Sequence, residues 1–221
     1  MKANTRKTHG FTLVELLLAM VLAGVVTVGI YSLYRSQQRS FAAQDELSQL
    51  QAKMRTALYF MERDIASAGC DPTGKANAGI LYASSNKIIL TEDRNANGDA
   101  TEYNEDVSYY IYLASGISKL GRETPAGHKQ PVAEYIDALD FVYLDRHGNV
   151  LNPHMSTVSN PQEIRSVQIT LVGRATKPVS GFKDTTVYKN QQGDTIFGPA
   201  NDGYRRLLMT TQVLCRNLAL K

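Results

Sequence analysis

The sequence is poor in the residues that mark several protein classes. It has no Trp, only two Cys and only seven Pro among its 221 residues. So few cysteines exclude a small scaffold held by many disulfides. A hydrophobic share of 43% excludes a disordered or collagen-like chain. The length suits one domain of ordinary size with an additional segment.

Most of the chain also lacks a charge excess. Three of its 24 basic residues and none of its 21 acidic residues lie in the first ten positions, so the remainder is electrically neutral. A nucleic-acid-binding protein would carry a strong basic excess, and we therefore expect no nucleic acid partner. The pI of 8.8 reflects the short N-terminal segment that holds Lys2, Arg6 and Lys7.

Enzyme motifs are missing as well. The sequence contains no H-E-x-x-H, no G-x-S-x-G, no P-loop and no paired-cysteine zinc spacing. The histidines His128, His147 and His154 are scattered in stretches typical of turns. We therefore expect a protein that is not an enzyme and has no cofactor, except for the calcium ion considered below.

One long apolar run, Phe11 to Tyr34, dominates the N-terminal part. As a helix it would be roughly 36 Å long, enough to cross a hydrocarbon core of about 30 Å. The basic residues before it predict a cytoplasmic N-terminus, with everything after Tyr34 across the membrane. A cleaved signal peptide is the alternative, but its apolar region would be shorter.

Glu15 is the single carboxylate in this run. A carboxylate in the apolar part of a membrane helix costs a few kcal/mol, so it usually marks function. Two explanations remain open from the sequence. Glu15 lies near the start of the run and could reach the lipid headgroups, or it could pair with a cation inside the membrane or in a packed bundle.

The hexapeptide Gly10-Phe11-Thr12-Leu13-Val14-Glu15, behind a short basic leader, resembles the processing motif of type IV pilins and of type II secretion pseudopilins. The resemblance implies cleavage after Gly10 by a prepilin peptidase and N-methylation of Phe11. It also implies a cation for Glu15, namely the N-terminal amine of Phe11 in a neighbouring subunit. An unpaired buried charge is strongly destabilising, so such a pair would set the register between subunits.

A second apolar pattern continues the helix beyond Tyr34. Its members recur at spacings of three and four: Leu47, Leu50, Met54, Leu58, Met61 and Ile65. Charged residues, Asp64 among them, are assigned to the other faces. We expect the stripe to pack on the chain's own globular domain rather than form a coiled coil. Gly69 and Pro72 predict the helix end, and no Pro occurs between Phe11 and Cys70.

After the helix the pattern alternates with the period of strands. The predicted strands are 87–91, 107–113, 138–144, 166–172 and 207–214, with a hairpin turn at 145–149 and a long loop with a short hairpin over 173–205. The fold class is therefore α+β, a long N-terminal helix packed on an antiparallel β-sheet. The expected division is a leader at 1–10, a transmembrane part at 11–34, an amphipathic part at 35–69 and a β-rich head at 70–221.

Later segments resemble the PilW-like minor pilins. They are Met61–Ile65, Ala68–Gly74, Ala78–Ile80, an acidic Asn/Gly loop before a Tyr-rich strand, and the closing Val213–Leu218. The resemblance implies a minor pilin that primes type IV pilus assembly. Its partners would be the prepilin peptidase, other minor pilins, the major pilin, the inner-membrane assembly platform and membrane lipid. Its head would lie in the periplasm until the subunit enters a filament. The type II secretion pseudopilin J is the related alternative.

Two further features stay open. Cys70 and Cys215 either form a disulfide that ties the helix end to the C-terminus, or are two buried free thiols. The loop residues Asp93, Asn95, Asn97 and Asp99, with Gly98 at the sixth position, match the opening of a calcium loop. Asn104 stands where that loop has its bidentate Glu, although Glu102 and Glu105 flank it. The alternative is a surface turn, where Asn, Asp and Gly are favoured for backbone reasons.

A membrane-tethered binding or sensing module, for instance for calcium, is the competing function. The combination of Gly10, Phe11 and Glu15 separates the two hypotheses, because a simple tether needs none of the three.

Overall fold

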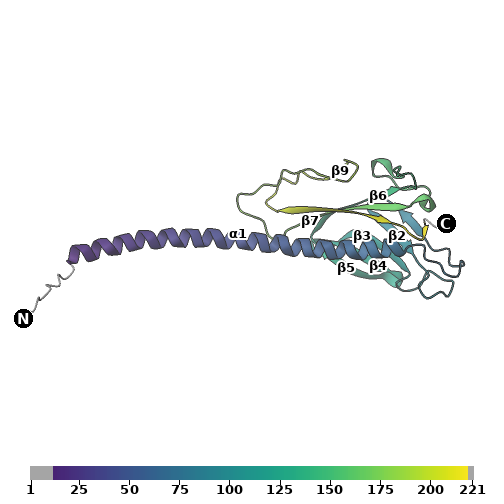
Figure 1. The fold of residues 1–221 in the computed structure, drawn as a ribbon, viewed down its shortest axis with the longest axis horizontal. Helices are drawn as coiled ribbons and strands as arrows, with labels where there is room; N and C mark the ends of the chain where they lie inside the picture. Colours follow the sequence, from purple (N-terminus) through teal and green to yellow (C-terminus); the bar gives the residue numbers. More distant parts are fainter. Residues whose placement is uncertain (1–11, 219–221) are drawn as a thin grey trace, which may run out of the picture. The chain divides into compact units, whose positions relative to one another are not determined.

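The computed structural model describes residues 12–218 and contains one long helix followed by antiparallel strands (Figure 1). The chain divides into two compact units between Asp45 and Glu46, which lies within the helix. We call residues 12–45 the N-terminal segment and the unit from Glu46 onward the head. The α+β class predicted from the sequence is confirmed, but the head includes the last part of the helix as well as the β-rich region.

Helix α1 covers Leu13–Ser67, as the unbroken absence of proline predicts. It ends where the sequence indicated, because Gly69 has a φ of +80° and supplies the left-handed residue of a helix C-terminus. A Cβ atom at Gly69 would lie 2.5 Å from Leu218 Cδ2, so the close approach of the C-terminal residues also requires glycine there.

The head contains two antiparallel sheets and a small hairpin. The first sheet has the order β1-β2-β3-β4-β5, with bounds Ile80–Ala83, Lys87–Thr91, Asp106–Ala114, Ile117–Thr124 and His128–Glu134. The second has the order β10-β7-β6, with bounds Arg206–Leu214, Ser166–Arg174 and Ile136–Leu144. Strands β8 (Tyr188–Lys189) and β9 (Thr195–Phe197) pair within the long loop. Short 3-10 helices lie at Pro125–Gly127, Pro153–Met155 and Pro161–Glu163.

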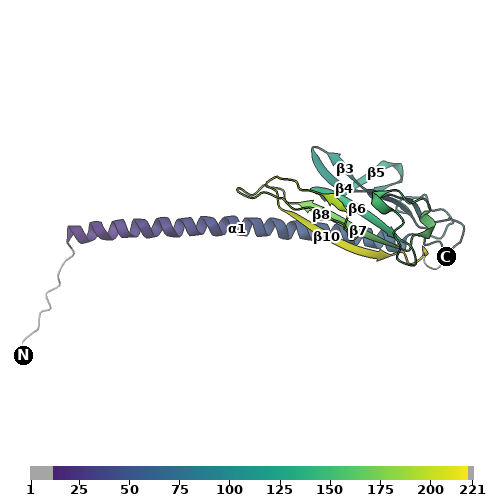
Figure 2. The same ribbon diagram turned by 90° about the horizontal axis from the view of Figure 1, so that it is seen from above.

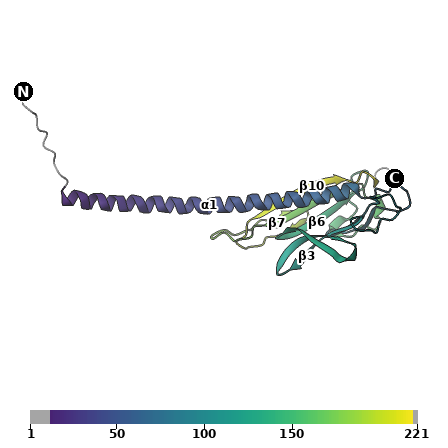
Figure 3. The same cartoon turned by 90° about the horizontal axis from the view of Figure 1, so that it is seen from below.

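The part of α1 within the head packs on both sheets, as Figures 1 and 3 show. Met54 and Leu50 lie directly over Gly173 of β7, where an added Cβ would come within 2.7 Å and 2.9 Å of their side chains. On the other sheet, the Tyr109 hydroxyl of β3 reaches Asp64 of α1 at 2.8 Å. The predicted stripe is therefore buried from Leu50 onward against the chain's own strands, and the coiled-coil alternative is wrong for the head.

The two sheets also contact each other and share one core. The Phe141 amide of β6 donates to Ser85 O at 2.8 Å, and the Tyr143 hydroxyl donates to Ser84 O at 2.9 Å. Phe141, Tyr143 and Tyr109 are fully buried in the same cluster as Met54 and Met61 of the helix. In Figure 2, the strands β3, β4 and β5 of the first sheet can be distinguished from the strands β7 and β10 of the second sheet.

The prediction of a single sheet was wrong. All five predicted strands exist, and β2 matches its predicted bounds, but β1, β4, β5 and the β8–β9 pair went unpredicted as strands, although a short hairpin was expected in the long loop. β5 reads HKQPVAE, with a Pro and few β-branched residues, so its sequence gives little strand signal. The predicted turn at 145–149 is confirmed, because the Asp145 amide donates to Asn149 O at 3.0 Å.

Candidate functional site

Glu15 closes a capping box at the start of α1. The Thr12 amide and hydroxyl donate to Glu15 Oε2 at 2.8 Å and 3.0 Å, and the Glu15 amide donates to Thr12 Oγ1 at 3.3 Å. This reciprocal arrangement satisfies backbone donors that a helix N-terminus leaves unpaired. Gly10 and Phe11, the predicted processing residues, lie outside the described residues. Glu15 is therefore held at the first turn of the helix, directly after them.

The rest of the N-terminal segment exposes an apolar surface on every side. The large hydrophobic side chains from Leu13 to Tyr34 are each between 54% and 74% exposed. Within the described residues, α1 is the one helix long and apolar enough to cross a membrane, and none of its most apolar window is buried in the chain. A helix that is hydrophobic all round requires an apolar environment from lipid or from other chains.

Polar groups in and after this surface are satisfied by their own helix. Thr27 Oγ1 donates to Ala23 O at 2.7 Å, so its hydroxyl places no unpaired group in an apolar surrounding. Near the end of the apolar run, the Arg35 guanidinium lies 5.8 Å from the Tyr31 ring centroid and Gln38 donates to the Tyr34 hydroxyl at 2.8 Å. Such aromatic residues beside polar ones are typical of a membrane–water interface.

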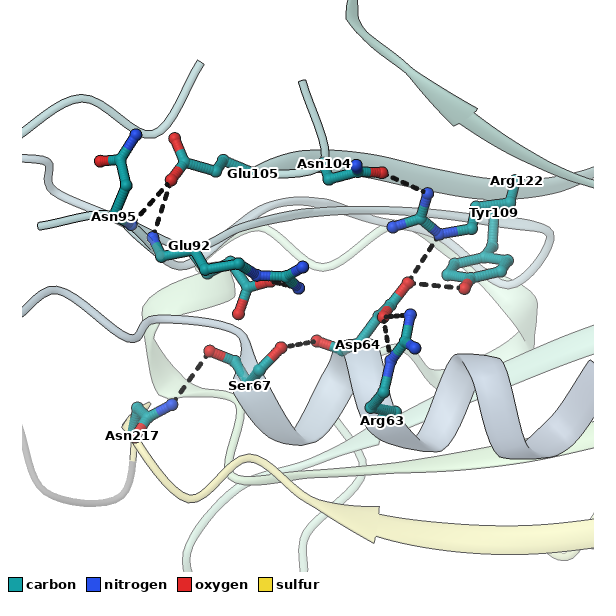
Figure 4. Close-up of polar contacts among 11 residues, drawn as sticks. Arg63, Asp64, Ser67, Glu92, Asn95, Asn104, Glu105, Tyr109, Arg122 and Asn217 are labelled. Atoms are coloured by element: carbon teal, nitrogen blue, oxygen red, sulfur yellow. Dashed lines mark hydrogen bonds and ion pairs between the residues drawn. The ribbon is translucent and has the colours of Figure 1, made fainter. Parts of the chain in front are cut away.

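In the head, Asp64 of α1 forms a buried ion pair with Arg122 of β4 (Figure 4). Arg122 Nε lies 2.8 Å from Asp64 Oδ2, and the same oxygen accepts the Tyr109 hydroxyl. Asp64 is 5% exposed and Arg122 is 9% exposed. Burial alone raises the pKa of Asp64, but the hydrogen bonds from Arg122 and Tyr109 outweigh it and lower the pKa below its ordinary value. The prediction that placed Asp64 on a helix face other than the apolar stripe was wrong, because Asp64 is buried with the stripe.

A second buried arginine holds the long loop on the second sheet. The Arg206 guanidinium bonds Asp137 at 2.7 Å, Asp184 at 3.0 Å and Asp202 at 2.7 Å. These hydrogen bonds, above all the one that Arg206 donates to Asp202, raise the pKa of Arg206 above its ordinary value. The network fastens Asp184 and Asp202 of the long loop to Arg206 of β10 and, through this arginine, to Asp137 of β6.

The structure brings the predicted calcium-loop residues together in the connection between β2 and β3. Asp93 is fully buried, and its carboxylate accepts hydrogen bonds from the amides of Asn97 and Gly98. Asn95 and Asn97 both donate to Glu102 at 2.9 Å. Asp99 caps the amide and hydroxyl of Thr101, at 2.9 Å and 2.8 Å.

The cysteines do not form the disulfide that was considered. Cys70 and Cys215 are both free. Cys215 is fully buried, and this burial raises its pKa to about 12, so it remains a thiol at neutral pH. Cys70 is half-buried just after the helix end, where its carbonyl accepts the Asp93 amide at 2.7 Å.

Sequence reasoning missed two arrangements. The capping box had a local signal, because Thr12 and Glu15 have the T-x-x-E spacing before an apolar run. Asp64 also had a partial signal, since it falls three residues after Met61 on the buried stripe. Its partners had none, because Tyr109 and Arg122 are 45 and 58 residues away along the chain.

Comparisons with known proteins found one match to the N-terminal sequence and one to the fold. The family described as the prokaryotic N-terminal methylation motif matches residues 5–31. In structure, the chain is similar to a type IV-like pilin from Thermus thermophilus, with a TM-score of 0.51 and 17% sequence identity. The similarity covers 77% of this chain and 98% of that one. No curated protein matches the chain in sequence.

The methylation motif covers residues 5–31, which include the start of α1, whereas the structural similarity extends over most of the chain. The motif implies processing by a prepilin peptidase and assembly with other pilins, and the apolar helix is consistent with membrane anchoring and incorporation into a pilus. The chain therefore combines the prokaryotic N-terminal methylation motif with a fold similar to that of a type IV-like pilin.

Proposed function

We propose that the chain is a minor pilin that primes type IV pilus assembly. Its role is structural rather than catalytic. In this proposal the prepilin peptidase cuts after Gly10, Phe11 is N-methylated, and the subunit waits in the inner membrane with its head in the periplasm. It then enters the filament together with other minor pilins. The methylation motif at residues 5–31 and the pilin fold support this sequence of events.

The observation that carries the proposal is the exposed apolar surface that begins beside Glu15. None of the most apolar window of α1 is buried within the chain. Transfer of such a surface from water is favourable by roughly 25 cal/mol per Å² of apolar area. Lipid can cover this surface before assembly, and the equivalent helices of neighbouring subunits can replace lipid in a filament. A single apolar helix therefore serves as anchor and then as interface.

Cleavage after Gly10 would leave the capping box intact, because Thr12 becomes the second residue of the mature chain. Both contacts from Thr12 to the Glu15 carboxylate use Oε2. Oε1 can then accept the N-terminal amine of Phe11 from a neighbouring subunit. The local contacts thus orient the carboxylate, and the neighbour supplies the cation.

Glu15 in this scheme specifies register more than affinity. A charge left alone in an apolar bundle is strongly destabilising, while a matched pair is tolerated. An incoming subunit therefore fits only where its Glu15 meets an amine. The type II secretion pseudopilin J would use the same chemistry, and recovery of the chain with pilus components rather than with secretion pseudopilins separates the two assignments.

The experiment compares Glu15→Ala and Glu15→Gln in sheared filaments. Both variants should be cleaved normally, because Glu15 lies beyond the bond after Gly10, and both should be strongly depleted from filaments or priming complexes. Glu15→Gln preserves shape and removes charge, so equal defects would assign the effect to charge. Glu163→Gln is the matched control, since Glu163 is an exposed head residue. Normal recovery of both Glu15 variants would overturn the pairing mechanism.

A further inference from the structure

A cavity lies on the outer face of the second sheet, the face opposite to α1. In β6, the side chains of Phe141 and Tyr143 belong to the core shared with the helix, so those of Asp140 and Val142 point to the other face. The β8–β9 hairpin covers part of this outer face, where Tyr188 packs on β6 and β7 (Figure 1). Between the hairpin and β6 the cavity has a volume of about 180 Å³.

Two carboxylates line this cavity and share one amide group. Asp140 is 1% exposed, and its Oδ2 accepts Asn190 Nδ2 at 2.9 Å. The same nitrogen lies 3.4 Å from Asp194 Oδ2, so a single NH₂ group lies between the two acids. Within the described part of the chain, Oδ1 of each carboxylate accepts no hydrogen bond. Because Asp140 is buried and lines the cavity, the cavity is where a ligand can reach its free oxygen.

The amide side chains around the acids are already used by the fold. Asn190 Oδ1 accepts the backbone amides of Gln192 and Asp194 at 3.0 Å and 2.9 Å, which fixes the turn between β8 and β9. Gln192 Nε2 donates to Gln168 Oε1 of β7 at 2.8 Å. Asn152, on the opposite wall, bonds the backbone of β6 through both its side-chain oxygen and its nitrogen. These contacts position the walls and leave the carboxylate oxygens as the charged groups open to a ligand.

The charge of the two acids is not compensated in the cavity. Among the described residues that line it, none is basic. Burial raises the pKa of Asp140 above its ordinary value, and the charge of Asp194 adds to this effect, although the Asn190 hydrogen bond opposes it. A buried carboxylate without a counter-ion is unfavourable, so a ligand that brings positive charge would be stabilised here.

The remaining lining of the cavity is apolar. It consists of Val142, Val150, Pro153 and the partly exposed Met155. A ligand recognised by charge alone would not need such a wall. A cavity of about 150 Å³ accommodates benzene, so this one has room for a charged group with a short hydrocarbon stem.

We propose that this cavity binds a primary alkylammonium group, such as a lysine side chain or a free diamine. The ammonium donates to Oδ1 of Asp140 and of Asp194. Its three N–H donors and lack of an acceptor match these free oxygens. The methylene stem lies against Val142, Val150 and Met155, as lysine stems do on apolar surfaces. A divalent metal ion fits less well, because no group of three or more His, Cys, Asp or Glu in the described chain is arranged to hold one.

Calorimetric titration of the full chain in detergent tests the site, with 1,5-diaminopentane as the probe. The diol 1,5-pentanediol has the same stem without charge, ammonium chloride has the charge without the stem, and calcium chloride represents a metal ion. We expect one diaminopentane per chain, bound about tenfold or more tighter than each of the others, because hydrogen bonds between charged groups are the stronger ones.

Three outcomes of this titration would overturn the proposal: no binding heat at millimolar diaminopentane, equal binding of the diol, or a preference for calcium. The test uses isolated protein, so its result is independent of filament assembly.

Three variants locate the ligand. Asp140→Asn keeps an acceptor for Asn190, so the ligand-free melting temperature should stay unchanged while diaminopentane affinity falls by about tenfold or more. Asp194→Asn changes a half-buried acid at the hairpin turn and should weaken binding by a smaller factor. Asp99→Asn removes an exposed acid from the loop before β3 and is the matched control. Unchanged affinity in both Asp140→Asn and Asp194→Asn would overturn this site.

Two further measurements distinguish the sources of the ammonium group. Native mass spectrometry of the chain purified without added amine would show the retained mass of a free diamine. Carbodiimide coupling in isolated membranes, followed by peptide mass spectrometry, would instead join Asp194 to a lysine of another chain. Either product should be lost in Asp140→Asn, and its persistence there would overturn the assignment to this cavity.

Discussion

Helix α1 carries two carboxylates in apolar surroundings, and their partners differ. Glu15 is bonded to Thr12, three residues away, on a segment whose apolar side chains are exposed. Asp64 is bonded to Tyr109 and Arg122, which come from two strands of the head. The charge of Asp64 is compensated within the fold by Arg122. Glu15 accepts hydrogen bonds only from the end of its own helix.

The difference shows which part of the helix has its apolar surface and its charge satisfied within the chain. In the head, the apolar stripe and its one acid are covered by strands, so folding alone satisfies them. In the N-terminal segment, neither the apolar surface nor the charge of Glu15 is compensated by the described chain. The same helix thus stabilises a head through one part and, as proposed above, an assembly through the other.

The largest effect is expected at the predicted processing site, where a substitution should block cleavage after Gly10. Gly10→Val should place side-chain bulk in the extended segment that enters the peptidase and should leave nearly all of the protein as full-length precursor in the membrane. Immunoblotting of membrane fractions separates precursor from mature chain. Gly29→Ala, which also alters a glycine of this segment, is the control and should be processed normally. Cleavage of Gly10→Val at the normal rate would contradict the prepilin assignment.

The head carboxylate gives the next largest effect. Asp64→Asn leaves the buried Arg122 guanidinium without a counter-ion and should lower the free energy of unfolding by about 3–5 kcal/mol. The double variant Asp64→Leu/Arg122→Met removes both charges and should recover most of this loss. Chemical denaturation of the full chain in detergent measures both. Equal losses in the single and double variants would show that the pair is not the cause.

Substitutions of two glycines compare the head with the N-terminal segment, and we expect a smaller effect on the free energy of unfolding. Gly173→Ala introduces a Cβ that would lie 2.7 Å from Met54 Sδ, so it should lower the free energy of unfolding by about 1 kcal/mol. Gly29 has nothing within 4 Å of an added Cβ, and Gly29→Ala should leave the melting temperature of the head unchanged. A larger loss at Gly29 than at Gly173 would contradict the assignment of α1 to two different environments.

The smallest effect concerns acid. Because the folded-state pKa of Asp64 is lowered, its ion pair stabilises the head fully above the unfolded pKa of about 3.9. This stabilisation is lost as the pH falls through the still lower folded pKa. The melting temperature of the wild type should therefore fall more steeply in this acidic range than that of Asp64→Leu/Arg122→Met. Parallel curves for the two proteins would assign acid sensitivity to other carboxylates.

Local patterns predicted the parts of the fold that depend on local chemistry. A glycine that adopts a left-handed conformation predicted the helix end at Gly69. Alternating apolar residues predicted the strand 87–91, and a turn that begins with Asp predicted the turn after Leu144. The division into two sheets depends on which strands pair across long separations. Strand β5 is a polar edge strand, so no periodic apolar pattern marked it.

The site shows the same limit. The motif around Gly10 and Glu15 is contiguous, so sequence alone indicated its chemistry. The buried pair of Asp64 and Arg122 joins residues from different elements. The sequence around Asp64, which follows Glu62 and Arg63 and precedes Ile65, gives no sign of its partner. The free cysteines were equally beyond prediction, because spacing does not fix how near two Cα atoms come.

Mass spectrometry of the mature N-terminus, in cells that contain the prepilin peptidase, tests the central claim most directly. The chain should begin at Phe11, carry one added methyl group on its amine, and revert to the full-length precursor when the peptidase is deleted. A mature protein that begins at Met1, or at a residue beyond the apolar run, would contradict assembly through Glu15 and a neighbouring Phe11 amine.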